Sequence, residues 1–316
     1  MNNPPKVLIC DKVHKAGIGI LKDAGFDVTI ADGISYEELL NVISDYEVVV
    51  VRSRTRISRD VINAAKNLRV IARVGAGTDN IDVDAARERG IDVVCAGDAV
   101  ANATAELTVG LMLALSRNIC LLNDEMKRGG WPKGKCEGVE LKGKTVGIIG
   151  AGRVGRRVAE LTKAFGMEVL LNDVVPIPDD FLKKVSGKVL PLIDLLKVSD
   201  YITVHVSLTP STRKLLNKDN MSFIKEGAFL VNTSRGAVID EDALYEALVT
   251  GRLRGAALDV YSVEPPVNRK LLELPNVICT PHIGAQTLEA QERASVEIAS
   301  KIIRLFSHTI TRTQTN

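Results

Sequence analysis

His282 is one of only four histidines in the chain, and a Thr-Pro pair separates it from the apolar run 277–279. An imidazole exchanges a proton near neutral pH, so a histidine at a strand end is a candidate proton carrier. Beside apolar residues, however, a buried structural histidine is the commoner case. The choice between these two interpretations depends on polar partners elsewhere in the sequence.

Polar residues also end two other apolar runs. Arg235 follows the run 228–231, and Asp259 and Glu264 follow the run 255–258. Parallel strands bring their carboxyl ends to one edge of a sheet, where ligands of open α/β sheets bind. Separately, these residues are explained by a surface charge, a helix N-cap and a rigid turn. Together, a guanidinium, an acid and an imidazole at one edge favour a catalytic His282.

A G-x-G-x-x-G motif at 150–155 lies between the apolar run 144–149 and a helix expected over 156–165. Such glycines allow a tight turn and close approach of the backbone to a pyrophosphate, whose charge the helix N-terminus attracts. Asp173 ends the next apolar run, where an acid accepts hydrogen bonds from ribose hydroxyls. This carboxylate would repel a 2′-phosphate, and no arginine follows it. The segment therefore predicts a dinucleotide site for NAD rather than NADP.

The bulk properties are those of an ordinary globular protein. With 316 residues, 46% hydrophobic and 25% charged, the chain predicts about two domains with separate cores. A net charge of +2 argues against nucleic acid or an anionic membrane as the partner. The five cysteines form no C-x-x-C pair, so we expect neither disulfides nor a metal site. We find no leader and no apolar run near 18 residues, which predicts a soluble cytoplasmic protein.

Two series of apolar runs supply the expected strands. The first series is 6–10, 47–51 and 70–73, with amphipathic segments at 36–44 and 59–66. The second series is 144–149, 168–171, 201–204, 228–231, 255–258 and 277–279. Runs that are apolar throughout, rather than alternating, predict strands covered on both faces. The fold class is therefore α/β, with two doubly wound parallel-sheet lobes.

Three further segments complete the organisation. We expect one long helix over 103–128 between the two lobes, and a last helix over 288–305 that packs on the first lobe. The segment 129–136 holds Trp131, the only tryptophan. It is either a solvated loop or an arm that packs on a second subunit, because an exposed tryptophan needs cover.

These motifs resemble the D-isomer-specific 2-hydroxyacid dehydrogenase family, over nearly the whole chain. The matching segments are the glycine motif 150–155, N-x-S-R-G at 232–236, A-L-D-V-Y-x-x-E-P-P at 257–266, P-H-I-G-A at 281–285, G-A-G-T-D-N-I-D at 75–82 and A-E-L-T at 105–108. Ser207 departs from the family, which usually has proline there.

The resemblance implies a Rossmann NAD-binding domain over 98–285 and a flavodoxin-like substrate-binding domain over 1–97 plus 286–316. The active site is expected in the cleft between the lobes. The arm with Trp131 favours a homodimer formed through the helix and arm 103–136. Because the chain stops soon after its last helix, we expect a form without the regulatory domains of longer members.

The same resemblance implies a role for each polar residue. His282 would take the proton of a substrate C2 hydroxyl, and Glu264 would hydrogen-bond the other ring nitrogen. Arg235 would bind the substrate carboxylate and polarise the C2 oxygen, and Asp259 would orient the nicotinamide carboxamide. The expected NAD-binding residues are Gly150, Gly152, Arg153, Val154, Gly155, Asp173, His205, Val206, Thr233, Ser234, Asp259, Gly284 and Ala285.

The expected substrate-binding residues are Arg52, Ser53, Arg73, Gly75, Ala76, Gly77 and Arg235. The Gly-rich turn would offer backbone N–H groups to the carboxylate. A phosphorylated 2-hydroxy acid also needs cations, for which the candidates are Arg52, Arg54, Arg56 and Arg73, with Lys133 and Lys135 reaching from a second subunit. If these cations form only a solvated loop, a reductase of unphosphorylated 2-hydroxy acids is the alternative, and a NAD-sensing binding protein without turnover is a third.

Overall fold

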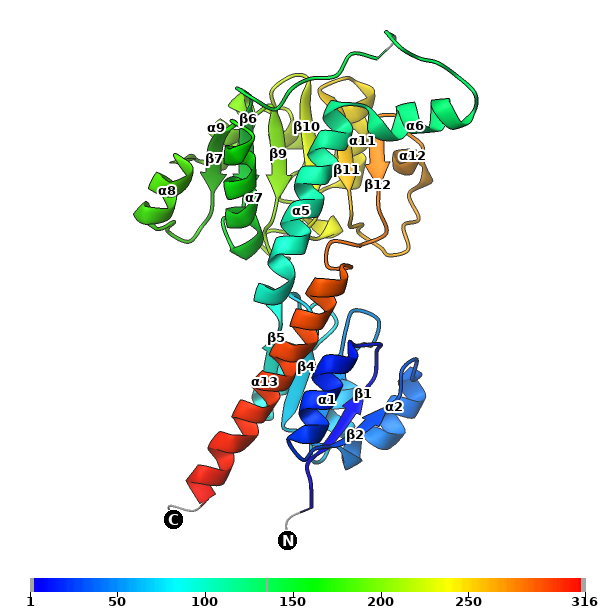
Figure 1. The fold of residues 1–316 in the computed structure, drawn as a ribbon, viewed down its shortest axis with the longest axis vertical. Coiled ribbons are helices and arrows are strands. Elements are labelled where there is room, and N and C mark those ends of the chain that lie inside the picture. Colours follow the sequence, from blue (N-terminus) through cyan, green and yellow to red (C-terminus); the bar gives the residue numbers. More distant parts are fainter. Residues whose placement is uncertain (1–2, 135, 314–316) are drawn as a thin grey trace. The chain divides into compact units, whose positions relative to one another are not determined.

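The chain folds into two compact units in a computed structural model that describes residues 3–134 and 136–313, with side chains up to Ser307. The first unit comprises Met1–Val100 and Ala285–Asn316, and the second comprises Ala101–Gly284. We expected the boundaries at 97/98 and 285/286. The helix called α5, Gly97–Ser116, starts in the first unit and continues into the second (Figure 1).

The first unit holds a parallel five-stranded sheet in the order β2-β1-β3-β4-β5, the doubly wound order of flavodoxin-like folds. Its strands are β1 Lys6–Ile9, β2 Asp27–Ile30, β3 Val48–Val51, β4 Val70–Arg73 and β5 Asp92–Cys95. The three strands expected from apolar runs are the central ones. The edge strands β2 and β5 were not predicted. Strand β2 is mostly exposed and alternates polar with apolar residues, whereas β5 contains the short apolar run 93–95, which was overlooked.

Helices surround this sheet: α1 Lys15–Asp23, α2 Tyr36–Val42, the 3₁₀ turn η1 Ile43–Asp45, α3 Arg59–Ala64, α4 Val83–Glu88 and α13 Leu288–Thr313. The last of these belongs to the first unit, as expected. It packs closely on α1, because a Cβ added to Gly17 would lie 2.3 Å from the Ser295 hydroxyl. Ser295 in turn donates a hydrogen bond to the His14 carbonyl (2.8 Å).

The second unit holds a parallel seven-stranded sheet in the order β12-β11-β10-β9-β6-β7-β8. Its strands are β6 Thr145–Ile149, β7 Glu168–Asn172, β8 Lys188–Val189, β9 Tyr201–Val204, β10 Ala228–Asn232, β11 Leu253–Leu258 and β12 Val277–Cys279. Strand β6 lies between β7 and β9, so the strand order reverses at β6 as in a Rossmann fold. Ligands of such sheets bind beyond the carboxyl ends at this reversal, where Gly150 follows β6.

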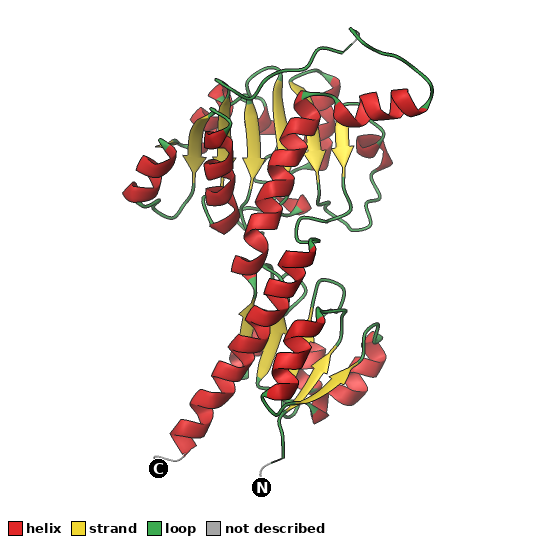
Figure 2. Ribbon diagram, in the orientation of Figure 1, coloured by secondary structure: helices red, strands yellow, loops and turns green. Residues whose placement is uncertain are grey.

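The helices of this unit, shown in red in Figure 2, lie on both faces of the sheet. They are α6 Ile119–Lys127, α7 Arg153–Ala164, α8 Asp179–Val185, α9 Leu192–Val198, α10 Lys218–Met221, the 3₁₀ turn η2 Gly236–Val238, α11 Glu241–Val249 and α12 Arg269–Leu272, together with α5. Helix α7 begins three residues before the expected start of 156, because Gly152 is its N-cap.

One expectation about this region was wrong. The helix expected over 103–128 is two helices, because Asn118 takes a left-handed conformation (φ 53°) between α5 and α6. In addition, α5 is long and apolar enough to cross a membrane by length and composition, with a mean hydropathy of 1.4. However, 67% of that stretch is buried, with Ala105 and Met112 in the core, as in a core helix of a globular domain.

Candidate active site

The glycine motif forms a cradle at the carboxyl end of β6. Gly150 has a φ of +95°, and a Cβ there would lie 2.8 Å from the His205 backbone. A Cβ at Gly155 would lie 1.9 Å from the Gly150 carbonyl oxygen, which keeps α7 close to β6. In contrast, a Cβ at Gly152 would meet no atom within 4 Å, so the space beside this residue is open. These glycines therefore leave an uncovered stretch of backbone where α7 begins.

Helix α7 has no side-chain cap at Gly152, so its first N–H groups are available to an anion. Asp173 lies directly after β7 beside this end of the helix. Its Oδ2 accepts a hydrogen bond from Ala151 N (2.6 Å), and its Oδ1 accepts one from Val175 N (2.9 Å). An open glycine, an uncapped helix and a fixed carboxylate suit the pyrophosphate and ribose of a dinucleotide. The residues present therefore fit NAD.

His205 borders the same cradle. Its backbone N–H donates to the Ile149 carbonyl (2.7 Å), which places it at the carboxyl end of β9 beside Gly150. Part of the residue reaches solvent, but both ring nitrogens are buried and have no hydrogen-bond partner among the described residues. Burial lowers the pKa of His205 to about 3, so the imidazole is neutral at physiological pH.

A histidine–carboxylate pair lies at the carboxyl edge of the same sheet, near the ends of β11 and β12. His282 Nδ1 is 2.8 Å from Glu264 Oε2, and each side chain is 39% exposed. A carboxylate only accepts hydrogen bonds, so Nδ1 carries the proton of this bond and Nε2 is left to face a substrate. Glu264 Oε1 also accepts a hydrogen bond from Tyr261 N (3.2 Å), which orients the carboxylate.

Glu264 remains ionised at neutral pH. Its burial raises the pKa, but the hydrogen bond and charge of His282, the Tyr261 N–H group and the Arg235 charge outweigh burial and bring the pKa below 4.5. Because the pKa of Glu264 is lowered, its pairing with His282 is fully present above the ordinary pKa of a glutamate. The pairing is lost only as the pH falls through the folded-state value.

Asp259 holds His282 in an unusual backbone conformation. His282 has a φ of +53°, which non-glycine residues rarely adopt. Asp259, whose exposed fraction is 1%, accepts hydrogen bonds from the Thr280 hydroxyl (2.6 Å), Ile283 N (2.8 Å) and Gly284 N (2.8 Å). Three donors thus fix the turn on both sides of the imidazole. Orientation of the nicotinamide carboxamide by Asp259 stays a prediction.

The turn that carries His282 is also crowded and cross-linked. A Cβ at Gly284 would lie 3.2 Å from Asp259 Oδ2, so side chains of the protein itself restrict the space there. The Tyr261 hydroxyl lies 3.1 Å from both the Leu258 and the Thr280 carbonyl oxygens. It therefore links the ends of β11 and β12. Tyr261 was not predicted as a site residue, although it lies within the motif 257–266 that contains Asp259 and Glu264.

Arg235 is carried by a loop after β10 that Asn232 shapes. The buried Asn232 side chain donates to the Arg235 carbonyl (3.0 Å) and accepts from Ser234 N (3.0 Å) and the Ser234 hydroxyl (2.9 Å). A Cβ at Gly236 would lie 1.9 Å from the Tyr261 carbonyl carbon. The loop of Arg235 therefore touches the segment that carries Glu264. Asn232 was missed as a positioning residue, although the N-x-S-R-G motif contains it.

The remaining cofactor candidates lie in the same unit, except Ala285. Thr233 and Thr108 share a hydrogen bond between their hydroxyls (2.8 Å), which ties the loop after β10 to α5. Arg153 and Val154 form the first turn of α7, and Val206 follows His205. Ala285 is the first residue of the first unit's second segment.

The substrate candidates of the first unit follow β3 and β4. Gly75 has a φ of +152°, and a Cβ there would lie 1.6 Å from Arg73 Nη1, so the Arg73 guanidinium lies against this turn. Arg54 pairs with the buried Asp11 (3.0 Å), which gives this arginine a structural role. Arg56 is exposed. Lys133 is exposed on the arm, and Lys135 lies outside the described residues.

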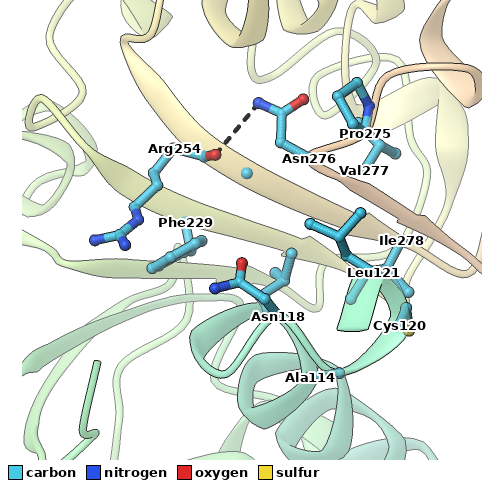
Figure 3. A pocket seen from close by; sticks show the side chains of 12 residues that line it. Ala114, Asn118, Cys120, Leu121, Phe229, Arg254, Pro275, Asn276, Val277 and Ile278 are labelled. Carbon is cyan, nitrogen blue, oxygen red and sulfur yellow. Dashed lines mark hydrogen bonds between the residues drawn. The ribbon is translucent and has the colours of Figure 1, made fainter. Parts of the chain in front are cut away.

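A pocket of about 110 Å³ opens on the opposite edge of the second sheet (Figure 3). It lies between the α5–α6 junction and the amino ends of β11 and β12, where Asn276 Nδ2 donates to the Arg254 carbonyl (3.2 Å). Because the catalytic candidates lie at the carboxyl ends, this pocket is separate from them. Among residues 3–134 and 136–313, no cluster of three histidine, cysteine or acidic side chains is placed to bind a metal.

A Rossmann-ordered sheet with a glycine cradle places the second unit among dinucleotide-binding α/β proteins. A family model for the NAD binding domain of D-isomer specific 2-hydroxyacid dehydrogenases matches residues 109–284. The chain belongs to this family, and NAD is its cofactor.

Related proteins match this chain in sequence over nearly its whole length. A D-3-phosphoglycerate dehydrogenase from Methanocaldococcus jannaschii is 47% identical over 95% of this chain, which spans only 57% of that protein. A hydroxypyruvate reductase from Thermotoga maritima is 42% identical over 95% of this chain and 97% of its own length. The crystal structure of a glyoxylate reductase from Paecilomyes thermophila has 30% identity and a TM-score of 0.88, over 95% of each chain.

Proposed function

We propose that the protein oxidises D-3-phosphoglycerate to 3-phosphohydroxypyruvate with NAD, the first step of phosphorylated serine biosynthesis. The observation that carries the proposed chemistry is the hydrogen bond between His282 Nδ1 and Glu264 Oε2 (2.8 Å). It fixes the tautomer that directs Nε2 toward the proton to be moved. Relatives named as D-3-phosphoglycerate dehydrogenases support the choice of substrate.

In this proposal the chain's own residues move the proton and stabilise charge. NAD, when bound on the residues around the glycine cradle, supplies the acceptor for the C2 hydride. His282 Nε2 takes the proton of the C2 hydroxyl as the C2–O bond becomes a carbonyl, and Glu264 stabilises the resulting imidazolium. Arg235 binds the carboxylate and polarises the C2 oxygen, because its charge persists at any working pH.

The phosphate is the basis for preferring this substrate. We propose that Arg52, Ser53 and Arg73 bind the anionic groups of the substrate, together with the turn 75–77. Arg54 is not included in this proposal, because its ion pair with Asp11 supports a structural role. Arg52 lies in a Val-Arg-Ser segment at 51–53 that supported the phosphorylated substrate. A hydroxypyruvate reductase among the relatives makes the unphosphorylated acids the second candidate.

The test is NADH formation near pH 9 with D-3-phosphoglycerate, D-glycerate and D-lactate in parallel, and with NADP in place of NAD. We expect kcat/KM to favour the phosphorylated acid by at least about a hundredfold, since a buried charge pair contributes a few kcal/mol. Equal or higher values for the unphosphorylated acids would move the assignment to a glyoxylate, hydroxypyruvate or D-lactate reductase. Absence of turnover with every acid would favour a NAD-sensing binding protein.

We also propose that the chain forms a homodimer through residues 103–136. None of the residues of α6 is buried, and Ile119, Leu121 and Met126 are between 41% and 51% exposed. Trp131 is 74% exposed on the adjoining arm. Exposed apolar side chains gathered on one segment are typical of a protein interface.

A double substitution tests the dimer. With L121E and W131E together, two charges enter the proposed interface, so sedimentation velocity should show one chain's mass where the unmodified protein shows twice that mass. V249E is the control, because Val249 is similarly exposed (57%) on α11 and should leave the dimer intact. An unmodified protein that sediments as a monomer at micromolar concentration would refute the proposal.

A further inference from the structure

The segments that follow β3 and β4 form one joined structure. Ile57 N donates to the Asn80 carbonyl (2.8 Å) and Asp82 N donates to the Ile57 carbonyl (2.9 Å), as in an isolated parallel bridge between Ile57 and Ile81. The segment 52–57 carries Arg52, and the segment 75–82 begins with the Gly75 turn. Two candidate binding segments are thus linked along their length.

The Asn80 side chain makes the link rigid where the binding residues lie. Its amide nitrogen donates to the Arg52 carbonyl (2.8 Å) and to the Thr55 carbonyl (2.5 Å). Both amide protons are therefore used to hold the other segment. Asn80 is partly buried. If its amide were removed, the Arg52 and Thr55 carbonyls would lose these hydrogen bonds.

Asp11 also holds the segment 52–57. Its carboxylate accepts from Arg52 N (2.5 Å), from the Thr55 hydroxyl (2.7 Å) and from Arg54 Nε (3.0 Å). Arg54 also donates to the Cys10 carbonyl (2.6 Å), so its guanidinium is directed toward the end of β1. On this loop Arg54 pairs with the buried acid, whereas among the described residues the Arg52 guanidinium makes only a long hydrogen bond to the Lys12 carbonyl (3.4 Å). We therefore assign the ligand contact to Arg52.

We propose that Asn80 is a positioning residue that sets the spacing between Arg52 and the turn 75–77. The proposal rests on the proposed function, because that spacing matters for a substrate with an anionic group at each end. A doubly anionic acid must meet the cation and the backbone N–H groups at once, so a small change in their separation weakens one contact or the other. An acid with a single carboxylate does not depend on the spacing.

The test compares N80D with the unmodified protein. Aspartate keeps the size of the side chain but replaces the donating NH₂ by an oxygen that repels the Arg52 and Thr55 carbonyls. N80A is the second variant, in case the added charge prevents folding. N67D is the matched control, because Asn67 is an exposed asparagine of the same unit that donates to the Ser44 carbonyl (2.7 Å).

We expect two independent results with N80D and N80A. Hydrogen exchange of peptides covering 52–57 should become about tenfold faster, whereas N67D leaves it unchanged. The KM for D-3-phosphoglycerate should rise about tenfold, with kcat and the KM for D-glycerate changed by less than about threefold. The double variant N67D/N80D should exchange at the same rate as N80D alone, since the two sites are independent.

Two outcomes would overturn the inference: unchanged exchange at 52–57, or faster exchange with an unaltered KM for the phosphorylated acid. Failure of the proposed function is seen separately, in the unmodified protein. If that protein does not favour the phosphorylated acid, the proposed substrate is wrong. The exchange result then still decides whether Asn80 holds the two segments together.

Discussion

Replacing His282 by asparagine is expected to lower kcat for the proposed hydroxy-acid oxidation by about a thousandfold, the contribution typical of a general base. Asparagine is similar in size and retains a polar side chain near Glu264, but it cannot take up the hydroxyl proton. The dinucleotide should bind as before, because the Gly150 cradle lies at other strands of the sheet. Steady-state kinetics together with titration of NADH fluorescence measure the two effects separately.

H14N is the matched control for this substitution. His14 accepts a hydrogen bond from Ala16 N (3.3 Å) at the start of α1, and an asparagine there can keep that cap. Its kcat should stay within about twofold of the unmodified value, as for a conservative change at a helix cap. If H282N retained more than about a tenth of the unmodified kcat, the proton would have to pass to another group, and His282 would be structural.

Substituting Gly236 by alanine is expected to reduce kcat by about a hundredfold, the cost of displacing reacting groups by about an ångström. An alanine Cβ would lie 1.9 Å from the Tyr261 carbonyl carbon, so the two segments must move apart. Arg235 lies on one segment and Glu264 on the other. Their separation therefore changes, while NADH binding at the glycine cradle should be largely retained.

G110A separates this effect from the general consequences of an added methyl group. Gly110 lies within α5, and a Cβ there would meet no atom within 4 Å. Alanine also favours a helix relative to glycine, so stability should be unchanged or slightly higher. Circular dichroism and thermal unfolding establish that G236A is folded. A folded G236A with kcat within about threefold of normal would show that this close contact is not needed for catalysis.

Both predictions depend on the way in which the site is held. The carboxylate of Asp259 accepts hydrogen bonds from backbone N–H groups that follow His282, and the hydroxyl of Tyr261 bonds to the Thr280 carbonyl before it. The Tyr261 N–H group orients Glu264. The left-handed backbone of His282 persists because its neighbours are fixed on both sides. The imidazole is therefore positioned before any ligand binds, which is a condition for efficient proton transfer.

Much of the fold was predictable because central parallel strands are buried on both faces and leave continuous apolar runs. The edge strand β2 was missed for the converse reason, since exposure mixes Asp27 and Thr29 into it. Strand β5 was missed although Val93 and Val94 are apolar, because so short a run is a weak signal. The break between α5 and α6 was missed because a single left-handed residue, Asn118, interrupts an otherwise helical pattern. Local composition does not report such a conformational change.

The sequence by itself determined the family, the cofactor and the candidates for chemistry, His282, Glu264 and Arg235. Motif spacing and strand ends are local, and parallel topology then brings the carboxyl ends to one edge. Only the tertiary structure decided which arginine is bound by Asp11, 43 residues away, and that Asn80 joins two loops. Such partners are distant in sequence, and their hydrogen bonds form only when packing brings the groups within reach.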